Sequence, residues 1–251
     1  MDGYGPSTYG DRFADVYDDW YEGVSDVDAT VARIAGLAGD SPVLELGAGS
    51  GRLAVPMAAA GLDVWAIDAS DAMLGRLRAR PDGERVHAVL DDMAVLGDPA
   101  LQRPGGFAVA LCAFNTLFNL TDTAAQRRCL TRARALLAQG GVLLVEAFVP
   151  PPDEGAAAAG AVEPRHIGLD EVVLTVSRLD TASRTVVGQH VHITEAGVRL
   201  RPWMLHYASP AELDSLAAEA DLRLVERHAG WRQEPFTDRS DLHVSVYAPG
   251  T

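Results

Sequence analysis

A short apolar run that ends in closely spaced glycines constrains this chain more than any other feature. Residues 43–46 read Val-Leu-Glu-Leu, and Gly47, Gly49 and Gly51 follow before a helical pattern begins. Glycine reaches turn conformations that other residues avoid, and its missing side chain lets a ligand approach the backbone. The segment therefore predicts a buried strand that runs through a bare turn into a helix, with a ligand across the strand end.

The next strand-like run, residues 64–67, leads into a carboxylate, Asp68. Asp68 stands 21 residues after Gly47. At the end of a second parallel strand, such a carboxylate lies beside the glycine turn and can accept hydrogen bonds from both hydroxyls of a ribose. The two features together predict a nucleoside cofactor.

Two cofactor classes compete for this pattern, and the glycine spacing separates them. The dinucleotide fingerprint G-x-G-x-x-G needs a glycine at position 52, where Arg52 stands, and the third glycine is Gly51 instead. An anionic pyrophosphate favours a helix N-terminus without acidic neighbours, whereas Glu45 just upstream favours an amino group or a cation. The pattern therefore disfavours NAD.

Helical and strand-like patterns alternate between residues 26 and 148. The strand-like runs are 43–46, 64–67, 86–90, 107–113 and 142–148, and the helical patterns are 26–37, 70–78 and 123–137. This alternation predicts an α/β fold, a parallel sheet with helices on both faces. Ahead of it, Phe13, Val16, Tyr17, Trp20 and Tyr21 recur at helical spacing and predict one helix with a buried aromatic side.

The pattern changes at residue 150. A Pro-rich and Ala-rich stretch, 150–160, is typical of a loop, and three β-rich runs at 172–179, 185–193 and 198–207 predict an antiparallel meander. A helix at 210–220 and strands at 222–226 and 243–247 return to the main sheet. We therefore expect one compact body divided into a cofactor-binding core with an N-terminal helical lid (1–149), an inserted cap over the acceptor pocket (150–208) and a returning segment (209–251).

Charge and composition narrow the function classes. The net charge is −14 and basic residues form no cluster, which argues against a nucleic-acid partner. No apolar stretch is long enough to span a bilayer and the N-terminus lacks a signal-peptide pattern, so we expect a cytoplasmic protein without a membrane partner. Cys112 and Cys129 lack metal-ligand spacing, and we expect neither a disulfide nor a zinc site.

Five ordered motifs resemble those of the class I methyltransferases that depend on S-adenosylmethionine (SAM). Glu45 followed by G-x-G-x-G is similar to the first motif of that family, and residues 68–74 resemble its D-x-S-x-x-M-L motif. Asp91-Asp92-Met93 resembles its G-D-M signature, and residues 114–120 its fourth motif. Residues 136–141 are similar to its L-x-P-G-G turn, with Gln139 in place of the proline.

The resemblance implies a Rossmann-like, seven-stranded methyltransferase sheet with an N-terminal helical lid and an inserted antiparallel β meander. It implies S-adenosyl-L-methionine as cofactor and S-adenosyl-L-homocysteine as product. Asp92 would hold the adenine amino group. The residues it assigns to cofactor binding are Glu45, Gly47, Gly49, Gly51, Asp68, Ala69, Met73, Asp92 and Met93.

Within that family, residues 9–18 are similar to bacterial N-methyltransferases that modify amino sugars and lincosamide antibiotics. In such enzymes, tyrosines of this segment close over the methyl donor, and an aromatic residue after the fourth strand borders the substrate. The resemblance therefore makes Tyr9, Tyr17 and Phe118 the catalytic candidates. Aromatic faces also attract a sulfonium or an amine through cation–π interaction.

The acceptor is expected to be a small molecule, with an amine nitrogen ahead of a hydroxyl oxygen. A hydroxyl acceptor would need a base, and His166 and His206 in the inserted region are candidates. His190 and His192 lie two apart on one strand face without a carboxylate-rich partner run, so we interpret them as packed or surface residues and expect no metal.

Three other functions stay open at this point. They are an O-methyltransferase of small natural products, an NAD-dependent oxidoreductase, and a SAM-binding scaffold without catalysis. The N-P-P-Y motif of base N-methylation is absent after the fourth strand, where Phe114-Asn115-Thr116-Leu117 stands. An inserted meander often provides a subunit contact, so a homo-oligomer is an additional expectation.

Overall fold

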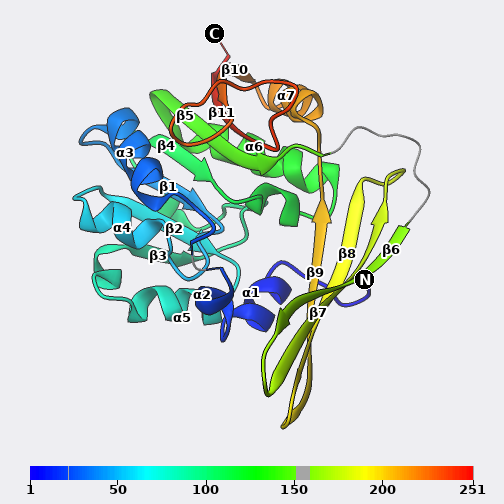
Figure 1. The fold of residues 1–251 in the computed structure, drawn as a ribbon. Coiled ribbons are helices and arrows are strands. Elements are labelled where there is room, and N and C mark those ends of the chain that lie inside the picture. Colours follow the sequence, from blue (N-terminus) through cyan, green and yellow to red (C-terminus); the bar gives the residue numbers. More distant parts are fainter. Residues whose placement is uncertain (22, 151–158, 251) are drawn as a thin grey trace.

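The chain folds into two sheets, and the computed structural model describes residues 1–21, 23–150 and 159–250. The larger sheet has seven strands in the order β10-β11-β5-β4-β1-β2-β3, and the smaller has four in the order β6-β7-β8-β9 (Figure 1). The strands of the larger sheet are β1 (Val43–Leu46), β2 (Val64–Asp68), β3 (His87–Leu90), β4 (Phe107–Cys112), β5 (Leu137–Phe148), β10 (Leu222–His228) and β11 (Leu242–Pro249).

Strand direction in the larger sheet determines where a ligand can lie. The five strands from β3 to β5 run parallel, whereas β11 pairs antiparallel with β5 and β10 antiparallel with β11. The chain passes from β1 to β2 on one side and reaches β4 on the other, so the connections after β1 and β4 diverge. In open α/β sheets, this divergence leaves a crevice at the carboxyl ends of the strands.

Helices cover both faces of the larger sheet, which confirms the predicted architecture. Helices α3 (Val27–Ala38), α4 (Ala54–Ala59) and α5 (Asp71–Ala79) pack on one face, and α6 (Thr123–Leu136) and α7 (Pro210–Glu219) on the other. In β1, Val43 packs in the cluster with Ile34 of α3, and Leu44 in the cluster with Leu130 of α6. A strand buried on both sides needs apolar residues on both.

Short 3-10 turns also occur at η1 (Gly83–Arg85), η2 (Pro99–Leu101) and η3 (Thr116–Asn119). Among the residues that the structure describes, no helix combines the length and the apolar composition that a bilayer span requires.

Side-chain caps explain why three helices begin where the sequence predicts. Asp26 Oδ1 accepts the Ala29 N–H at the start of α3, and Asp122 Oδ1 accepts the Ala125 N–H at the start of α6. Ser70 Oγ accepts the Met73 N–H in the same way at the start of α5. Each cap satisfies a backbone N–H that the helix itself leaves without a partner.

The N-terminal segment differs from its prediction, because the single expected helix is two short ones, α1 (Thr8–Phe13) and α2 (Tyr17–Trp20). Between them, Val16 has φ −121° and ψ −4°, outside the helical range. The break lets Asp15 reach Arg201 on the smaller sheet, where Arg201 Nη2 donates to Asp15 Oδ2 at 2.9 Å. Arg201 is fully buried, and a buried guanidinium requires a carboxylate partner.

The smaller sheet has four antiparallel strands where the sequence predicts three. They are β6 (Ala159–Ile167), β7 (Glu171–Asp180), β8 (Thr185–Thr194) and β9 (Gly197–His206). The missed strand, β6, lies at the sheet edge and contains Pro164, which a strand tolerates at an edge but which disguises it in the sequence. The structure corrects the predicted loop 150–160 in its last two residues, and residues 151–158 lie outside the described part.

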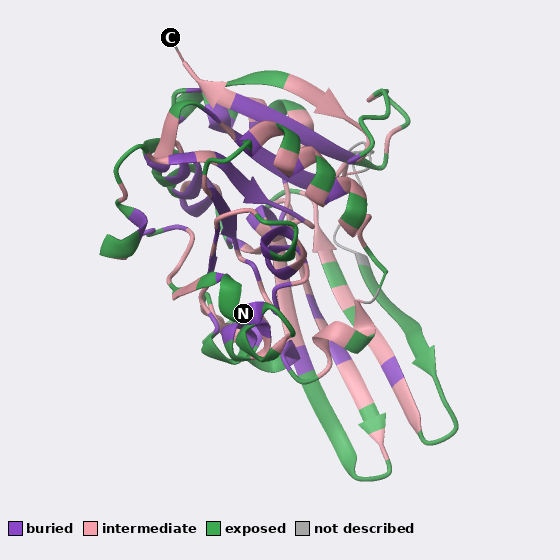
Figure 2. Ribbon diagram, turned by 90° about the vertical axis from the view of Figure 1, so that its left-hand side faces the viewer, coloured by how far each residue is buried: buried purple, intermediate pink, exposed green. Residues whose placement is uncertain are grey.

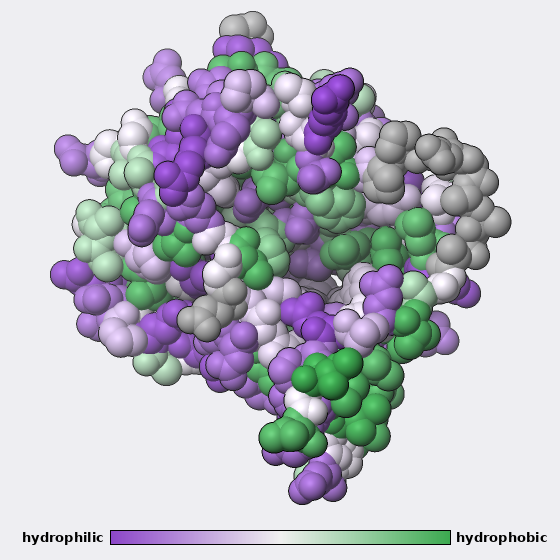
Figure 3. Space-filling model, in the orientation of Figure 1, coloured by the Kyte–Doolittle hydropathy of each residue, from purple (hydrophilic) through white to green (hydrophobic). Residues whose placement is uncertain are grey.

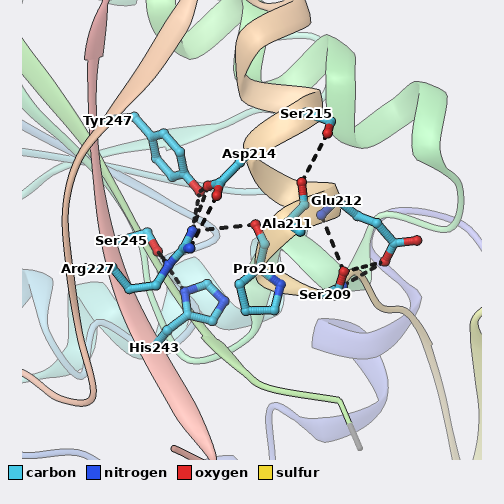
Figure 4. Close-up of polar contacts among 10 residues, drawn as sticks. All are labelled: Ser209, Pro210, Ala211, Glu212, Asp214, Ser215, Arg227, His243, Ser245 and Tyr247. Atoms are coloured by element: carbon cyan, nitrogen blue, oxygen red, sulfur yellow. Dashed lines mark hydrogen bonds and ion pairs between the residues drawn. The ribbon is translucent and has the colours of Figure 1, made fainter. Parts of the chain in front are cut away.

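Figure 2 shows the smaller sheet projecting from the body, with buried residues concentrated in the larger one. Strand β9 lies nearest to the N-terminal helices and leads directly into α7 (Figure 1). Ser209 caps α7 through a reciprocal arrangement with Glu212, whose carboxylate accepts the Ser209 N–H at 2.8 Å (Figure 4). The start of α7 is therefore fixed beside the end of β9.

A partly buried polar network joins α7 to the two closing strands (Figure 4). Arg227 Nη2 donates to Asp214 Oδ1 at 2.6 Å, and Arg227 Nε donates to Ser245 Oγ at 2.8 Å. The Tyr247 hydroxyl also donates to Asp214 Oδ1, at 2.8 Å. Because these contacts cross between a helix and two strands, they fix β10 and β11 against the covering helix.

Candidate functional site

A cleft of about 440 Å³ opens at the carboxyl ends of β1, β2 and β4. Its floor comes from the turns after these strands, and its walls come from α1, α2 and the strands β8 and β9. In the space-filling view, the surface is hollowed between the body and the smaller sheet (Figure 3). The cleft therefore occupies the crevice that the strand order predicts.

The glycine turn after β1 lines the cleft with two of its three glycines. Gly47 has φ +66°, and a Cβ there would lie 2.3 Å from Thr116 Cγ2, so only glycine fits. Gly49 has φ +56° and also lines the cleft. Gly51 lies outside the cleft lining. A Cβ at Gly51 would lie 2.6 Å from Leu77 Cγ, so the missing side chain allows the turn to pack closely on α5.

Asp68 lies at the end of β2 with its carboxylate fixed by two backbone donors. The Gly49 N–H donates to Oδ2 and the Ser70 N–H donates to Oδ1, both at 2.8 Å. Burial raises the pKa of Asp68, and the backbone hydrogen bonds oppose that rise. Each oxygen keeps lone pairs for further donors, so the carboxylate can accept the two hydroxyls of a ribose.

The loop after β3 brings Asp92 and Met93 to the cleft, beside Ala69 and Met73 from the second motif. Asp92 Oδ1 accepts the Ala94 N–H at 2.8 Å, which orients its side chain within the turn. Neighbouring Asp91 also lines the cleft. This end therefore combines apolar side chains that can contact a flat base with carboxylates that can accept from an amino group.

Glu45 is buried and Arg52 is half-buried beside the glycine turn, and both lie outside the cleft lining. Glu45 is 4% exposed, its Oε2 atom has no partner, and burial raises its pKa to about 8 although the charge of Arg52 opposes this. Arg52 lies 5.0 Å above the Phe114 ring, and its Nε and Nη1 atoms have no partner. A carboxyl group and a guanidinium group thus each keep buried atoms without a hydrogen-bond partner.

Sequence reasoning used Arg52 only to exclude an NAD fingerprint and missed it as a site residue. Its position directly after the third glycine was the available signal, because that position lies in the turn two residues before α4. A guanidinium there can bind a carboxylate through two parallel hydrogen bonds.

An aromatic wall from the N-terminal helices closes one side of the cleft. The Tyr9 hydroxyl donates to the Tyr21 hydroxyl at 3.2 Å, and the rings of Tyr17 and Tyr21 lie 4.8 Å apart. Burial raises the pKa of Tyr9 well above its usual value and that of Tyr17 to about 12. Both therefore remain neutral hydroxyls at physiological pH.

Tyr21 lines the cleft with Tyr9 and Tyr17, yet sequence reasoning placed it only on the apolar side of the N-terminal helix. Its spacing from Tyr17 was the signal, because residues four apart share a helix face. Arg165 of β6 lies 5.0 Å from the Tyr21 ring and donates to the Trp20 carbonyl at 3.0 Å. The smaller sheet therefore contacts this segment from outside.

Phe118 does not lie where the resemblance places it. The 3-10 turn η3 directs its ring into the body, where it is fully buried against Ala147 and Ala208 and away from the cleft. Phe114 lines the cleft instead, four residues earlier. Its backbone has φ +49°, and its N–H donates to Glu146 Oε2 at 2.7 Å, which fixes this strained turn.

Strands β8 and β9 contribute His190, Trp203 and Leu205 to the cleft. His190 is 6% exposed and its Nδ1 atom lies 3.0 Å from Thr175 Oγ1. Burial lowers the pKa of His190 to about 4, so the ring is neutral at physiological pH. The sequence predicts a packed or surface residue at position 190, and His190 is packed and also lines the cleft.

The histidines named as possible bases lie elsewhere. His206 Nε2 lies 2.9 Å from Thr123 Oγ1 at the start of α6, and His166 pairs with Glu171 at an exposed end of the smaller sheet. Neither lines the cleft. Within the described ranges, no group of three or more His, Cys, Asp or Glu side chains could hold a metal ion.

Taken together, the cleft offers a carboxylate that can accept ribose hydroxyls and aromatic faces opposite it, with the carboxyl group of Glu45 and the guanidinium group of Arg52 nearby beside the glycine turn. A nucleoside that carries an amino acid and a positive charge matches these features, because the rings attract a cation and these two groups complement an ammonium and a carboxylate. SAM has this composition, and the residues present fit it.

Comparison with known proteins gives an independent result. Residues 43–141 match the family model described as "Methyltransferase domain". The CcbJ methyltransferase from Streptomyces caelestis is 37% identical to this chain, covers 99% of this chain and 100% of its own, and superposes with a TM-score of 0.88. No curated protein sequence matches the chain significantly.

Two more distant solved structures share the fold. CalS10 from Micromonospora echinaspora, an amino pentose methyltransferase solved with SAM bound, is 21% identical, with 92% of this chain and 96% of its own covered and a TM-score of 0.66. KedS8, a sugar N-methyltransferase from Streptoalloteichus, is also 21% identical, with 98% of both chains covered and a TM-score of 0.64.

Proposed function

Because this chain belongs to the SAM-dependent methyltransferases, we propose that it methylates an amine nitrogen of a small molecule such as an amino sugar or a lincosamide-like antibiotic intermediate. SAM supplies an electrophilic methyl group on a sulfonium and leaves as S-adenosyl-L-homocysteine. The protein contributes position and a water-poor environment, since a displacement at carbon needs little covalent help.

In this proposal, the residues of the glycine turn and the second motif bind the donor. Asp68 accepts the ribose hydroxyls, and Gly47 and Gly49 let the donor approach the backbone. Asp92 accepts from the adenine amino group, and Ala69, Met73 and Met93 contact the base. Glu45 and Arg52 interact with the amino-acid end, because their unpaired atoms are the nearest buried complement to an ammonium and a carboxylate.

The aromatic wall receives the acceptor. The Tyr9 hydroxyl donates a hydrogen bond to Tyr21, so the lone pairs of the Tyr9 oxygen remain for an N–H of the acceptor. Tyr17 covers the donor at Gly49, where its ring would lie 3.9 Å from a Cβ, and Phe114 takes the place expected for Phe118. A hydrogen bond from the acceptor N–H to the Tyr9 oxygen would orient the nitrogen lone pair toward the methyl carbon.

The observation that carries nitrogen over oxygen is the protonation state of this wall. The pKa of Tyr9 lies well above 10 and that of Tyr17 is about 12, so both hydroxyls stay un-ionised at neutral pH. Neither hydroxyl can therefore act as the base that an alcohol acceptor needs. An amine can enter in its neutral form and needs only orientation. The printed activities of CalS10 and KedS8, an amino pentose and a sugar N-methyltransferase, support the same acceptor class.

The division into core and lid (1–149), cap (150–208) and returning segment (209–251) is part of this proposal. The smaller sheet covers the acceptor side through His190, Trp203 and Leu205, and the N-terminal helices act as the lid. The acidic charge of −14 supports a small-molecule acceptor rather than nucleic acid, and we propose a cytoplasmic location and a homo-oligomer.

The test pairs each amine with the alcohol of the same skeleton. Purified enzyme is incubated with SAM and an amino sugar or the corresponding hydroxy sugar, and mass spectrometry detects the gain of one methyl group. We expect methylation of the amine only. Methylation of the alcohol alone would contradict the proposal, and binding of NADH but not SAM in calorimetry would contradict the donor.

The catalytic role of the tyrosines has its own test. Tyr9→Phe and Tyr17→Phe should each reduce turnover by about tenfold, the value of one well-placed hydrogen bond, while SAM affinity measured by calorimetry stays similar. Unchanged turnover in both variants would exclude that role. A Phe118→Leu control lies in the body and should leave SAM affinity unchanged.

O-methylation is the second candidate, and His190 is the observation that favours it. Its imidazole is neutral, buried and part of the cleft, so it could accept the proton of an alcohol. If turnover fell as the pH was lowered and His190→Gln abolished this pH dependence, the result would support oxygen as the acceptor atom.

A further inference from the structure

The turn after β4 brings Phe114 to the cleft in a backbone conformation that its side chain disfavours. Phe114 has φ +49° and Asn115 has φ +61°, both in the left-handed region. Asparagine tolerates this region, whereas a bulky side chain such as that of phenylalanine makes it costly. Strained residues beside a cleft persist only where the surrounding structure holds them. The conformation of Phe114 therefore needs support from outside the turn.

Strand β5 supplies this support through Glu146. The parallel pairing of β4 with β5 ends where Cys112 lies beside Val145. Directly beyond that point, the Phe114 N–H donates to Glu146 Oε2 at 2.7 Å, and the Asn115 N–H donates to the Glu146 carbonyl at 3.0 Å. One residue of β5 thus accepts from the backbone N–H groups of both residues with positive φ.

The other carboxylate oxygen of Glu146 is occupied as well. The indole Nε1–H of Trp231 donates to Glu146 Oε1 at 2.9 Å. Trp231 comes from the segment between β10 and β11 and is 6% exposed, and Glu146 is 9% exposed. An amide could accept only one of these two hydrogen bonds, because the other end of an amide is itself a donor. The carboxylate therefore connects the returning segment to the cleft turn, which glutamine at this position could not do.

We propose that Glu146 is a positioning residue for methyl transfer, which acts through the Phe114 backbone and holds the Phe114 ring at the border of the acceptor. The ring lies between residues proposed for both substrates, because its centroid is 5.0 Å from the Arg52 guanidinium and 5.9 Å from the centroid of the Tyr21 ring. A shift of Phe114 would therefore displace a contact of each. The inference rests on the proposed function in one respect, the place of Phe114 beside the acceptor.

Three variants isolate the hydrogen bond to Phe114. Trp231→Phe removes the indole donor and leaves the carboxylate in place. In the Trp231→Phe background, Glu146→Gln offers one oxygen, for which the Phe114 N–H no longer competes with the indole, and Glu146→Leu offers none. The kcat of each variant is measured by mass spectrometry with SAM and the amino sugar that the wild-type enzyme methylates, and SAM affinity is measured by calorimetry.

The expected kcat separates the variants. Trp231→Phe and the Gln variant should stay within about threefold of the wild type, whereas the Leu variant should be at least about tenfold slower, because a small misplacement of a positioning group slows an in-line transfer. SAM affinity should stay within about twofold in all three. A Gln variant as slow as the Leu variant would overturn the proposal. A Leu variant with a lower denaturation midpoint but wild-type kcat, the result of a merely structural role, would overturn it as well.

Crystal structures of the same variants give a readout that does not depend on turnover. Phe114 should keep its positive φ in the Gln variant and lose it in the Leu variant, and a Leu variant with unchanged φ would overturn the proposal. If the Leu variant does not bind SAM, Glu146→Met replaces it, since methionine has similar length and no oxygen. The Gln variant also decides alone, because a tenfold loss of kcat in it would contradict a role through this hydrogen bond.

Failure of the proposed function would look different. If the wild-type enzyme methylates the hydroxy sugar instead of the amino sugar, the same three variants are compared on the hydroxy sugar, and the expected order of kcat is unchanged. If the wild-type enzyme methylates neither sugar, the proposed acceptor class fails, and the φ of Phe114 in the variants still decides whether Glu146 holds the turn.

Discussion

The cleft and the network between α7, β10 and β11 both bury charged side chains, but they pair them differently. Arg227 donates from all three guanidinium nitrogens to Asp214, Ser245 and other acceptors (Figure 4). Arg52, beside the cleft, keeps two nitrogens without a partner, and Glu45 keeps one oxygen. Buried polar groups without partners cost free energy. The network pairs its charged groups within the fold, whereas we propose that the unpaired atoms of Glu45 and Arg52 bind a ligand.

The largest expected effect concerns the carboxylate of β2. Asp68→Ala should weaken SAM binding at least about 100-fold, because it removes two charge-assisted hydrogen bonds of about 1.5–3 kcal/mol each. Isothermal titration measures the loss. The control Asp71→Ala removes an exposed carboxylate three residues later, which pairs only with Arg78 at the surface, and should bind SAM as the wild type does. Equal affinity in Asp68→Ala would remove it from the donor site.

The two arginines allow a direct test of the comparison. Arg227→Met should lower the free energy of unfolding by about 2 kcal/mol, because partly buried Asp214 loses its counter-ion, with SAM affinity unchanged. Arg52→Met should reduce SAM affinity about tenfold and leave the free energy of unfolding unchanged. Denaturant unfolding and calorimetry on both variants decide this. Destabilisation by Arg52→Met would show that it holds the fold.

The pH dependence of stability should carry opposite signs in the two regions. Burial raises the pKa of Glu45 from 4.5 to about 8, so its contribution to the free energy of unfolding is present below pH 4.5 and declines as pH rises through 8. Burial lowers the pKa of His243 from 6.5 to about 4, so that contribution is present above pH 6.5 and declines toward pH 4.

Variants separate these two contributions. Glu45→Gln should flatten the decline on the alkaline side, and His243→Gln should flatten the decline on the acid side, in denaturant midpoints measured from pH 4 to pH 9. His190 titrates in the same direction as His243, so some acid dependence should persist in His243→Gln. A Glu45→Gln profile identical to the wild type would mean that this carboxyl is not perturbed.

The smallest effect is expected at Tyr21. Tyr21→Phe should lower turnover only about threefold, because it removes the acceptor of the Tyr9 proton but leaves the ring in place. A structural role alone would change SAM and acceptor affinity instead of turnover, so separate measurement of kcat and KM distinguishes the two. An unchanged kcat would show that Tyr9 does not need the hydrogen bond to Tyr21 for its orientation.

Local signals explain what the sequence could predict. The strand at 43–46, the glycine turn and Asp68 all depend on residues close together in the chain, and the structure has each of them in the predicted place. The caps at Asp26, Ser70 and Asp122 act over three residues and fix their helices equally well. Short-range backbone rules therefore suffice for the cofactor half of the cleft.

The side of the cleft proposed for the acceptor depends on contacts that sequence patterns do not show. The break between α1 and α2 accompanies the ion pair between Asp15 and Arg201, 186 positions away. The exchange of Phe118 for Phe114 follows from the 3-10 turn η3 and from the positive φ of Phe114, which a helical or strand periodicity does not reveal. Strand β6 was missed because its Ala, Gly and Pro content hides its pairing with β7.

Strand β9 connects three parts of the molecule at once. Its Arg201 holds the segment between α1 and α2, Trp203 and Leu205 border the cleft, and Ser209 just beyond it begins α7. Trp203 leans so closely on β8 that a Cβ at Gly188 would lie 2.3 Å from the indole. A bulky acceptor that widens the cleft would therefore press on this strand, and any displacement of the strand would reach α7 and the N-terminal helices together.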